Sequence, residues 1–183
     1  MKEIVQRDAP VLREKAKEVP LKDIKSLKIK KVIKDMKEAL ASQDDGVALA
    51  APQIGVSLRI FIITEKIYDI LYPEEKGKKG KINLVYINPK VTKLSKEQKL
   101  LEEGCLSVRW LYGKKVRSTK ATVSAYDEKG EKFERGGSGL IAQIFQHETD
   151  HLDGVLFIDN AEDLHELPPE KIPSRLKKET SNA

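Results

Sequence analysis

Residues 146–152 of the chain read Gln146-His147-Glu148-Thr149-Asp150-His151-Leu152 and contain an H-E-x-x-H motif. Apolar residues recur ahead of the motif at helical spacing, beginning at Leu140, so we predict that a helix carries it. At about 100° per residue, His151 lies only about 40° around this helix from His147, and both imidazoles can reach one ion. Glu148 lies about 60° from His151, so it borders the ion without having to bind it, which suits a general base.

The two histidines are expected to face the core, because their arc overlaps the apolar arc of the helix. Buried imidazoles without polar partners are costly, and a cation between them offsets that cost. We therefore predict a metal site instead of two packed or solvated histidines. The remaining histidine, His165, stands in a polar segment and is expected at the surface.

A catalytic zinc or iron site needs a third protein ligand and one open position for water. Downstream of the motif, Asp159 and Glu162 are candidates for this ligand. Upstream stands Cys105, the only cysteine of the chain, which cannot form an internal disulfide and is either a free thiol or a metal ligand. Gly104 before it lets the backbone approach a site closely, and a dication stabilises a thiolate, which favours Cys105.

Elsewhere the periodicities predict one earlier helix and several short strands, which together with the motif helix indicate an α+β domain. The earlier helix spans residues 27–40, and the expected strands are residues 60–63, 84–87, 116–126, 131–134 and 155–158. Asn88-Pro89 should end the second strand, residues 65–82 should form an irregular insertion, and Ser138 should cap the motif helix. We expect residues 1–160 to form a single catalytic domain and residues 161–183 a polar C-terminal tail.

The composition limits the class of protein. The 183 residues are 39% hydrophobic and 34% charged, which is enough for one buried core. No apolar run approaches the roughly 20 residues of a membrane-spanning helix, so we expect no membrane association. No signal peptide is recognisable at the start, which favours a cytoplasmic location. The net charge of +5 is spread along the chain, so we expect no sequence-specific binding to nucleic acid.

Three stretches together resemble the motifs of the peptide deformylase family. The family's first motif, GφGφAAxQ with φ hydrophobic, is similar to Gly46-Val47-Ala48-Leu49-Ala50-Ala51-Pro52-Gln53. The second, EGCxS, matches Glu103-Gly104-Cys105-Leu106-Ser107, and the third, QHExDHL, matches residues 146–152. Weaker similarity extends the resemblance over residues 3–160, and three motifs in this order are far more specific than H-E-x-x-H alone.

The resemblance implies an α+β fold in which antiparallel sheets surround a central metal-binding helix. It also implies that Cys105, His147 and His151 hold one divalent metal ion, most often Fe(II) in the family, although zinc, nickel or cobalt suit the same ligands. Members of the family remove the formyl group from the N-terminal formyl-methionine of newly made polypeptides and release formate. N-formylmethionyl nascent peptides are therefore the expected partners.

The same resemblance assigns roles to the neighbouring residues. Glu148 would be the general base and acid, while Gln53 and the backbone N–H of Leu106 would donate hydrogen bonds to the oxyanion. The expected substrate-binding positions are Gly46, Ala48 and Gly104.

Two departures from the family motifs bear on the substrate. The first motif usually has glycine where this chain has Ala48, whose methyl group can hinder a substrate backbone. After Ser107 the family often continues with a small apolar residue and proline, whereas this chain reads Val108-Arg109-Trp110. Trp110 and Tyr112 either line the substrate pocket or cap the core.

Two other functions stay open on the sequence alone. An H-E-x-x-H metallopeptidase would need its third ligand downstream of the motif. A non-catalytic deformylase relative would keep the fold and bind peptide N-termini, although the presence of Glu148 and Gln53 speaks against it. The C-terminal tail is basic and either docks on the ribosome or stays solvated, its basic residues being Lys171, Arg175, Lys177 and Lys178.

Overall fold

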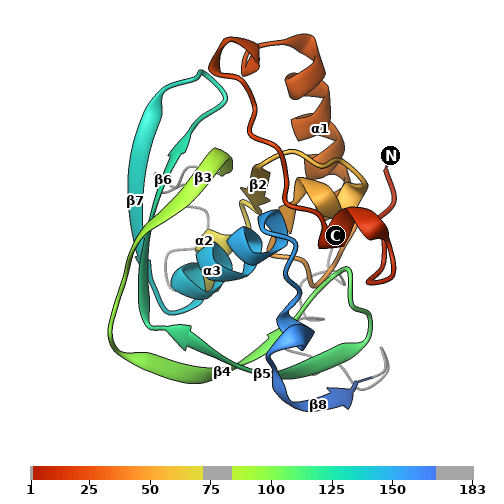
Figure 1. Cartoon of the computed structure of the whole chain (residues 1–183), viewed down its shortest axis with the longest axis vertical. Coiled ribbons are helices and arrows are strands. Elements are labelled where there is room, and N and C mark those ends of the chain that lie inside the picture. Colours follow the sequence, from red (N-terminus) through yellow and green to blue (C-terminus); the bar gives the residue numbers. More distant parts are fainter. Residues whose placement is uncertain (1, 72–83, 168–183) are drawn as a thin grey trace.

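Helix α3 (Leu140–Leu152), which carries the H-E-x-x-H motif, lies in the middle of the molecule (Figure 1). The computed structural model describes residues 2–71 and 84–167. One sheet stands beside α3 and a second passes along another side of it, while α1 (Leu27–Ala41) lies at the opposite end of the molecule from the second sheet (Figure 1). The predicted α+β fold, with antiparallel sheets around the motif helix, is thereby confirmed.

The two sheets are both antiparallel. The larger has the order β1-β2-β3-β6-β7, with β1 at Ala48–Ala50, β2 at Ile60–Ile63, β3 at Val85–Leu94, β6 at Lys120–Tyr126 and β7 at Lys132–Ser138. The smaller has the order β4-β5-β8, with β4 at Gln98–Gly104, β5 at Leu111–Ser118 and β8 at Glu162–Glu166. The remaining elements are helix α2 (Ile67–Leu71) and four 3₁₀ turns, η1 (Pro10–Arg13), η2 (Leu21–Asp23), η3 (Ala51–Ile54) and η5 (Phe157–Asp159), among the described residues.

Aromatic packing fixes α3 against the larger sheet. Phe145 of α3 is fully buried, and its ring centroid lies 5.4 Å from that of Tyr86 in β3. Tyr86 in turn stacks on Phe61 of β2, with 4.4 Å between the centroids. Since Phe145 comes two residues before His147, this contact sets the position of the motif relative to the sheet.

The predicted helix at residues 27–40 is confirmed as α1. Ser26 precedes it in extended conformation, and its Oγ accepts a hydrogen bond from the backbone N–H of Ile29 at 3.3 Å. The residues that recur at helical spacing are the buried ones, namely Ile29, Val32, Ile33, Met36 and Leu40. α1 therefore packs its apolar face onto β1 and β2. The chain runs from the C-terminal end of α1 through residues 42–47 into β1, next to the functional site.

The expectation that Asn88-Pro89 ends a strand is wrong, because β3 continues to Leu94. Asn88 adopts a φ of 52°, a left-handed conformation that asparagine tolerates, and the register shifts between Ile87 and Lys90. The Asn88 side chain bonds both the N–H and the C=O of Val19 at 2.8 Å. The chain thus passes through a bulge, which accommodates the proline within the strand.

The strands predicted at residues 116–126 and 131–134 are confirmed only in part. β6 and β7 pair around the turn at residues 127–130, but residues 116–118 belong to β5 and pair with β4. Residues 116–126 contain no glycine, proline, asparagine or aspartate that would mark the bend at Thr119, so the sequence does not show the boundary. β7 is also longer than predicted and includes Gly137, where a Cβ atom would sit 2.1 Å from Cγ2 of Ile141. The glycine lets α3 approach this strand closely.

Three further expectations are wrong. Ser138 lies in β7 and pairs with Lys120, and α3 begins after Gly139 without a side-chain cap. Residues 155–158 form no strand, since their apolar side chains are buried by packing around η5 instead of by pairing in a sheet. The irregular insertion contains α2, in which Ile67 is fully buried, while residues 72–83 lie outside the described residues.

Strand β8 pairs with β5 and so brings residues 162–166 into the smaller sheet. The division into a domain of residues 1–160 and a tail of residues 161–183 stays a prediction, and residues 168–183 lie outside the described part. His165 in β8 is exposed, as expected. Across the described part of the chain, every helix is too short or too polar to cross a membrane.

Candidate metal centre

Three potential metal ligands converge at one end of α3. His147 and His151 come from successive turns of the helix, and Cys105 follows the end of β4. One ligand atom from each of the three lies within 4.8 Å of the others, and the Sγ of Cys105 is 3.1 Å from Nε2 of His151. Among the described residues this is the group of histidine, cysteine and carboxylate side chains that could hold a metal ion.

A buried carboxylate orients the first histidine. Nδ1 of His147 lies 2.6 Å from Oε1 of Glu103, and Arg117 bonds the same carboxylate through Nη2 at 2.6 Å and Nε at 3.0 Å. Burial raises the pKa of Glu103, but the hydrogen bonds from His147 and Arg117 outweigh it and hold that pKa well below its usual range. An ionised carboxylate only accepts, so Nδ1 of His147 donates and Nε2 is left for a metal.

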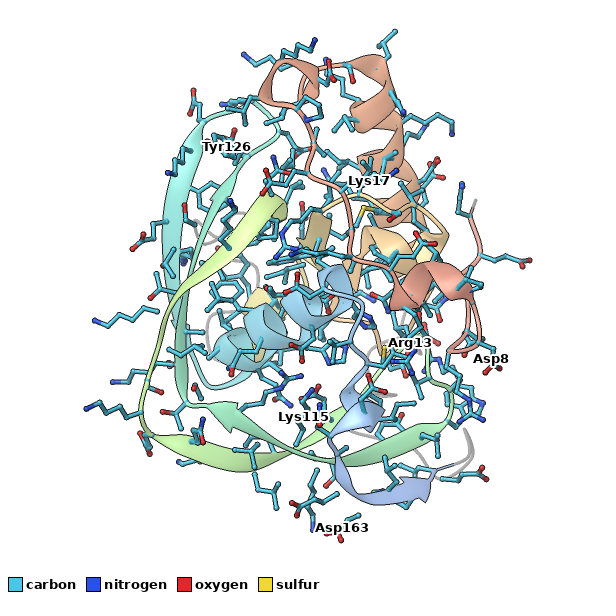
Figure 2. The ribbon with its side chains drawn as sticks, in the orientation of Figure 1. Asp8, Arg13, Lys17, Lys115, Tyr126 and Asp163 are labelled. Carbon is cyan, nitrogen blue, oxygen red and sulfur yellow. The ribbon has the colours of Figure 1, made fainter. Side chains whose placement is uncertain are left out.

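A second buried contact links the smaller sheet to α3. Lys115 points from β5 toward the helix (Figure 2), and its Nζ lies 3.0 Å from Oδ2 of Asp150. Nη1 of Arg117 binds the same oxygen at 2.7 Å. Glu103, Arg117, Asp150 and Lys115 therefore form a network of two positive and two negative charges between β4, β5 and α3. Because each charge has an opposite partner, the network can hold the smaller sheet on the metal-binding face of the helix.

Glu148 is buried beside the two histidines, with 4% of its surface exposed. Its Oε2 has no hydrogen-bond partner among the described residues. Burial raises the pKa of this carboxyl to about 7, against 4.5 for an ordinary glutamate. A group that gains and loses a proton near neutral pH is suited to general acid–base work.

Gln53 presents its amide NH₂ to the site. Its Oε1 accepts a hydrogen bond from the N–H of Ala50 at 2.8 Å, which fixes the orientation of the side chain. Nε2 then points toward Cys105 and Ser107, at 3.6 Å from Sγ and 3.2 Å from Oγ. The backbone N–H of Leu106 donates to no acceptor among the described residues. Two N–H donors without strong partners thus stand next to Cys105.

A pocket of about 230 Å³ opens next to these groups. The predicted substrate-binding residues Gly46, Ala48 and Gly104 all line it. A Cβ atom on Gly104 would sit 2.6 Å from the ring of Tyr112, so glycine is needed there for close packing. Tyr112 also lines the pocket, whereas Trp110 lies under the guanidinium of Arg109, 4.4 Å from its ring centroid.

The donor set and its electrostatics fit a cation. Burial and the neighbouring His147 lower the pKa of His151 well below its usual value, so this imidazole is neutral and can coordinate. Burial also lowers the pKa of His147, but contacts with Cys105 and Glu103 outweigh it and raise that pKa well above normal. Cys105 and Glu103 therefore stabilise positive charge beside the His147 ring, and a metal ion would bind there in place of the second ring proton. Nδ1 of His151 is buried and has no partner among the described residues.

The downstream candidates for the third ligand lie elsewhere. Oδ2 of Asp159 is bound by Arg13 at 2.7 Å and by the N–H of Leu156 at 2.9 Å. Glu162 lies on the exposed strand β8, opposite Lys114. The peptidase-type ligand set is thus not brought together, whereas the set with Cys105 is.

Sequence reasoning missed the charge network behind the site. Glu103 stands within the second motif, and its position next to Gly104-Cys105 was the available signal. For Arg117 and Lys115 the sequence signal was weak. Charged residues alternate along β5, and this pattern is equally typical of a strand face exposed to solvent. Both are buried.

Comparison with known proteins agrees with this geometry. The family model described as polypeptide deformylase matches residues 1–166. A peptide deformylase of Dehalococcoides mccartyi is 38% identical over 181 residues, which cover 97% of this chain and 98% of that protein. The crystal structure of peptide deformylase from Thermotoga maritima superposes with a TM-score of 0.73 at 35% identity, covering 88% of this chain and 98% of that one.

A second solved structure carries a ligand. The peptide deformylase of Synechococcus elongatus in complex with actinonin superposes with a TM-score of 0.76 at 33% identity, covering 88% of this chain and 81% of that one. Sequence identity above 30% over nearly the full length, together with the same fold, establishes the family of this chain. The chain belongs to the peptide deformylase family, whose metal-dependent enzymes hydrolyse the N-formyl group of nascent polypeptides.

Proposed function

We propose that Cys105, His147 and His151 hold one divalent cation, Fe(II) in the cell, and that the chain uses it to remove the formyl group from nascent formyl-methionyl polypeptides. Three ligand atoms converge within 4.8 Å beside Oε2 of Glu148, which has no hydrogen-bond partner within residues 2–71 and 84–167, and this arrangement carries the proposal. Zinc, nickel and cobalt suit one sulfur and two nitrogen ligands as well.

The reaction breaks the C–N bond of a formamide, which is a stable amide. A divalent cation in this site supplies Lewis acidity and makes a water molecule nucleophilic near neutral pH. Glu148 takes a proton from the attacking water and passes it to the departing amine nitrogen. The products are formate and a polypeptide with a free amino group on its first methionine.

The two N–H donors act on the developing negative oxygen. Nε2 of Gln53 is held in place by the bond between its own Oε1 and Ala50, and the N–H of Leu106 has no acceptor in the described part of the chain. Donors aimed at an oxyanion strengthen their bonds only as charge develops, so they favour the transition state over the substrate. One such donor contributes about 2.7–4 kcal/mol to the barrier reduction.

The substrate backbone would lie along Gly46, Ala48 and Gly104, since all three line the pocket and two have no side chain. The apolar part of the pocket, which includes Val47 and Ile144, suits the methionine side chain.

Formate release from formyl-Met-Ala tests the proposal. The protein is purified and assayed without oxygen and loaded with Fe(II) or Ni(II), and a Glu148→Ala variant serves as control. We expect turnover in the wild type and none above background in the control. Equal rates in both would favour a protein that only binds peptide N-termini, and cleavage of internal peptide bonds would favour a metallopeptidase.

The same proposal includes the location of the protein and its contact with the ribosome. Since formylated chains emerge from the ribosome, we place the protein in the cytoplasm, with the basic residues of the tail docking on ribosomal RNA. Co-sedimentation with ribosomes at rising salt tests this docking. Loss of co-sedimentation on deletion of residues 168–183 is the expected result, and unchanged, salt-insensitive co-sedimentation would rule docking out.

A further inference from the structure

An ion pair lies in the lining of the pocket. The guanidinium of Arg109 donates to both carboxylate oxygens of Asp45, with 2.9 Å between Nη2 and Oδ1. Nη2 also donates to Oε1 of Gln43 at 2.9 Å. The exposed fractions of the two charged side chains are only 17% and 19%, so water screens the pair far less than a surface salt bridge. Arg109 and Asp45 are called the clasp below.

The clasp joins the two walls of the pocket. One wall is the segment of residues 43–48 that leads into β1, and the other is the segment of residues 104–112 around Cys105. Within the described residues, every hydrogen bond between these two segments comes from Arg109. Both members of the clasp line the pocket themselves. The clasp is therefore the polar tie between the two segments, beside the packing of Leu106 near Gly46.

Arg109 is held from other sides as well. Its backbone N–H donates to Oε1 of Gln6 at 3.3 Å, and its guanidinium lies over the Trp110 ring. The Nε2 of the same glutamine donates to the C=O of Leu106 at 3.2 Å. The second wall is thus braced by the N-terminal segment, and the clasp ties the first wall to this braced loop.

We propose that the clasp sets the width of the pocket and so determines which first side chain the enzyme accepts. This inference rests on the proposed function and adds a specificity determinant to it. With the walls tied, an unbranched chain such as methionine enters, while a bulky aromatic ring requires the walls to separate. Arg109 and Asp45 are positioning residues here, because they act through the wall segments and not on the reacting atoms.

The test is a double-mutant cycle on substrate preference. We compare kcat/KM for formyl-Met-Ala-Ser and formyl-Phe-Ala-Ser in the wild type, Arg109→Ala, Asp45→Ala and the double variant. Each single variant should reduce the preference for methionine about tenfold, which is within the range that pocket shape supplies. The double variant should lose no more than either single one, since neither residue holds the walls alone. The change should lie in KM, with kcat for the methionine peptide nearly kept.

A matched control removes an ion pair far from the pocket. Lys37 binds Glu128 at 3.1 Å on the surface, and Lys37→Ala should leave both rate and preference unchanged. If Asp45→Ala keeps the wild-type preference while Arg109→Ala loses it, arginine contacts the substrate directly and the clasp is wrong. An unchanged preference in both variants also overturns it.

Two further experiments distinguish a wrong clasp from a misfolded variant and from a failure of the proposed function. If the alanine variants fold poorly, the exchanged pair Arg109→Asp with Asp45→Arg should restore the preference, and failure to do so in a folded protein contradicts the clasp. Calorimetric affinities for the two formyl peptides are measured in a Glu148→Ala background, where the peptides are not consumed. If the wild type releases no formate, the proposed function fails, and these affinities still show whether Arg109 sets the preference.

Discussion

The Sγ of Cys105 lies 3.1 Å from Nε2 of His151, although 46 residues separate them in the chain. The contact exists because β4 ends beside α3, where the side chain of Gln143 donates to the C=O of Glu102 at 2.8 Å. A thiol and an imidazole this close are a ready pair of metal ligands, and His147 completes the set.

Replacement of Cys105 by serine should remove the metal. A serine hydroxyl is a poor ligand for Fe(II) or zinc, so we expect metal affinity and formate release to fall by more than about 100-fold. This loss exceeds the one expected when a residue that only hydrogen-bonds to a metal ligand is removed. Metal content after dialysis and activity measure this. Asp159→Asn is the matched control and should keep both, whereas loss in that variant alone would move the third ligand downstream.

The pH dependence of activity should report Glu148. Its pKa is about 7 in the protein without a metal, and a neighbouring cation favours the ionised form, which lowers that pKa. A base works when deprotonated, so kcat/KM should fall with decreasing pH. The midpoint should lie between the ordinary glutamate value of 4.5 and about 7. A profile that stays flat from pH 7 down to 4.5 would mean that another group is the base.

Removal of Arg117 should damage both stability and the metal site. Arg117→Ala leaves Glu103 buried without its main counter-charge, and breaking a buried pair in this way costs about 3–5 kcal/mol. Since Glu103 orients His147, metal affinity should also fall about 10- to 100-fold. Urea unfolding and metal titration measure the two effects. Lys37→Ala, which breaks an exposed pair, should change stability by less than about 1 kcal/mol, and a similar small effect for Arg117→Ala would argue against the network.

Ala48→Gly should raise activity while lowering stability. The methyl group of Ala48 lines the pocket where the family motif has glycine, and relief of such crowding is worth about 1 kcal/mol or more, which corresponds to a several-fold gain in kcat/KM. Glycine in a strand costs about 0.5–1 kcal/mol of stability. Ala125→Gly in β6 is the matched control and should show the stability loss without the gain. No gain in Ala48→Gly would show that the methyl group does not hinder the substrate.

The parts of the fold that follow from local pattern were predictable. Apolar residues recur at helical spacing in α1 and α3, and residues 60–63 form a short apolar run. The local pattern is therefore sufficient to predict these three elements. Residues 155–158 have the same apolar character as a strand, but Leu156 and Phe157 are buried by packing in one cluster with Leu12 and Val108. A short apolar run is expected both for a buried strand and for a buried segment outside a sheet, so the sequence could not distinguish the two structures.

The site divides in the same way. The H-E-x-x-H spacing places His147, His151 and Glu148 on one helix face, which is a local property. Cys105 was a candidate as the only cysteine, beside Gly104, and the resemblance of whole motifs supported it. Gln53 entered only through that resemblance, since nothing in its spacing brings it to α3. The clasp between Arg109 and Asp45 was out of reach, because a pairing across 64 residues depends on how two loops pack.

X-ray absorption at the zinc edge of zinc-loaded protein tests the metal site most directly. We expect one sulfur neighbour at about 2.3 Å and at least two nitrogen or oxygen neighbours at about 2.0–2.1 Å, with the sulfur lost in Cys105→Ser. A wild-type spectrum with nitrogen and oxygen neighbours but no sulfur would contradict this metal site.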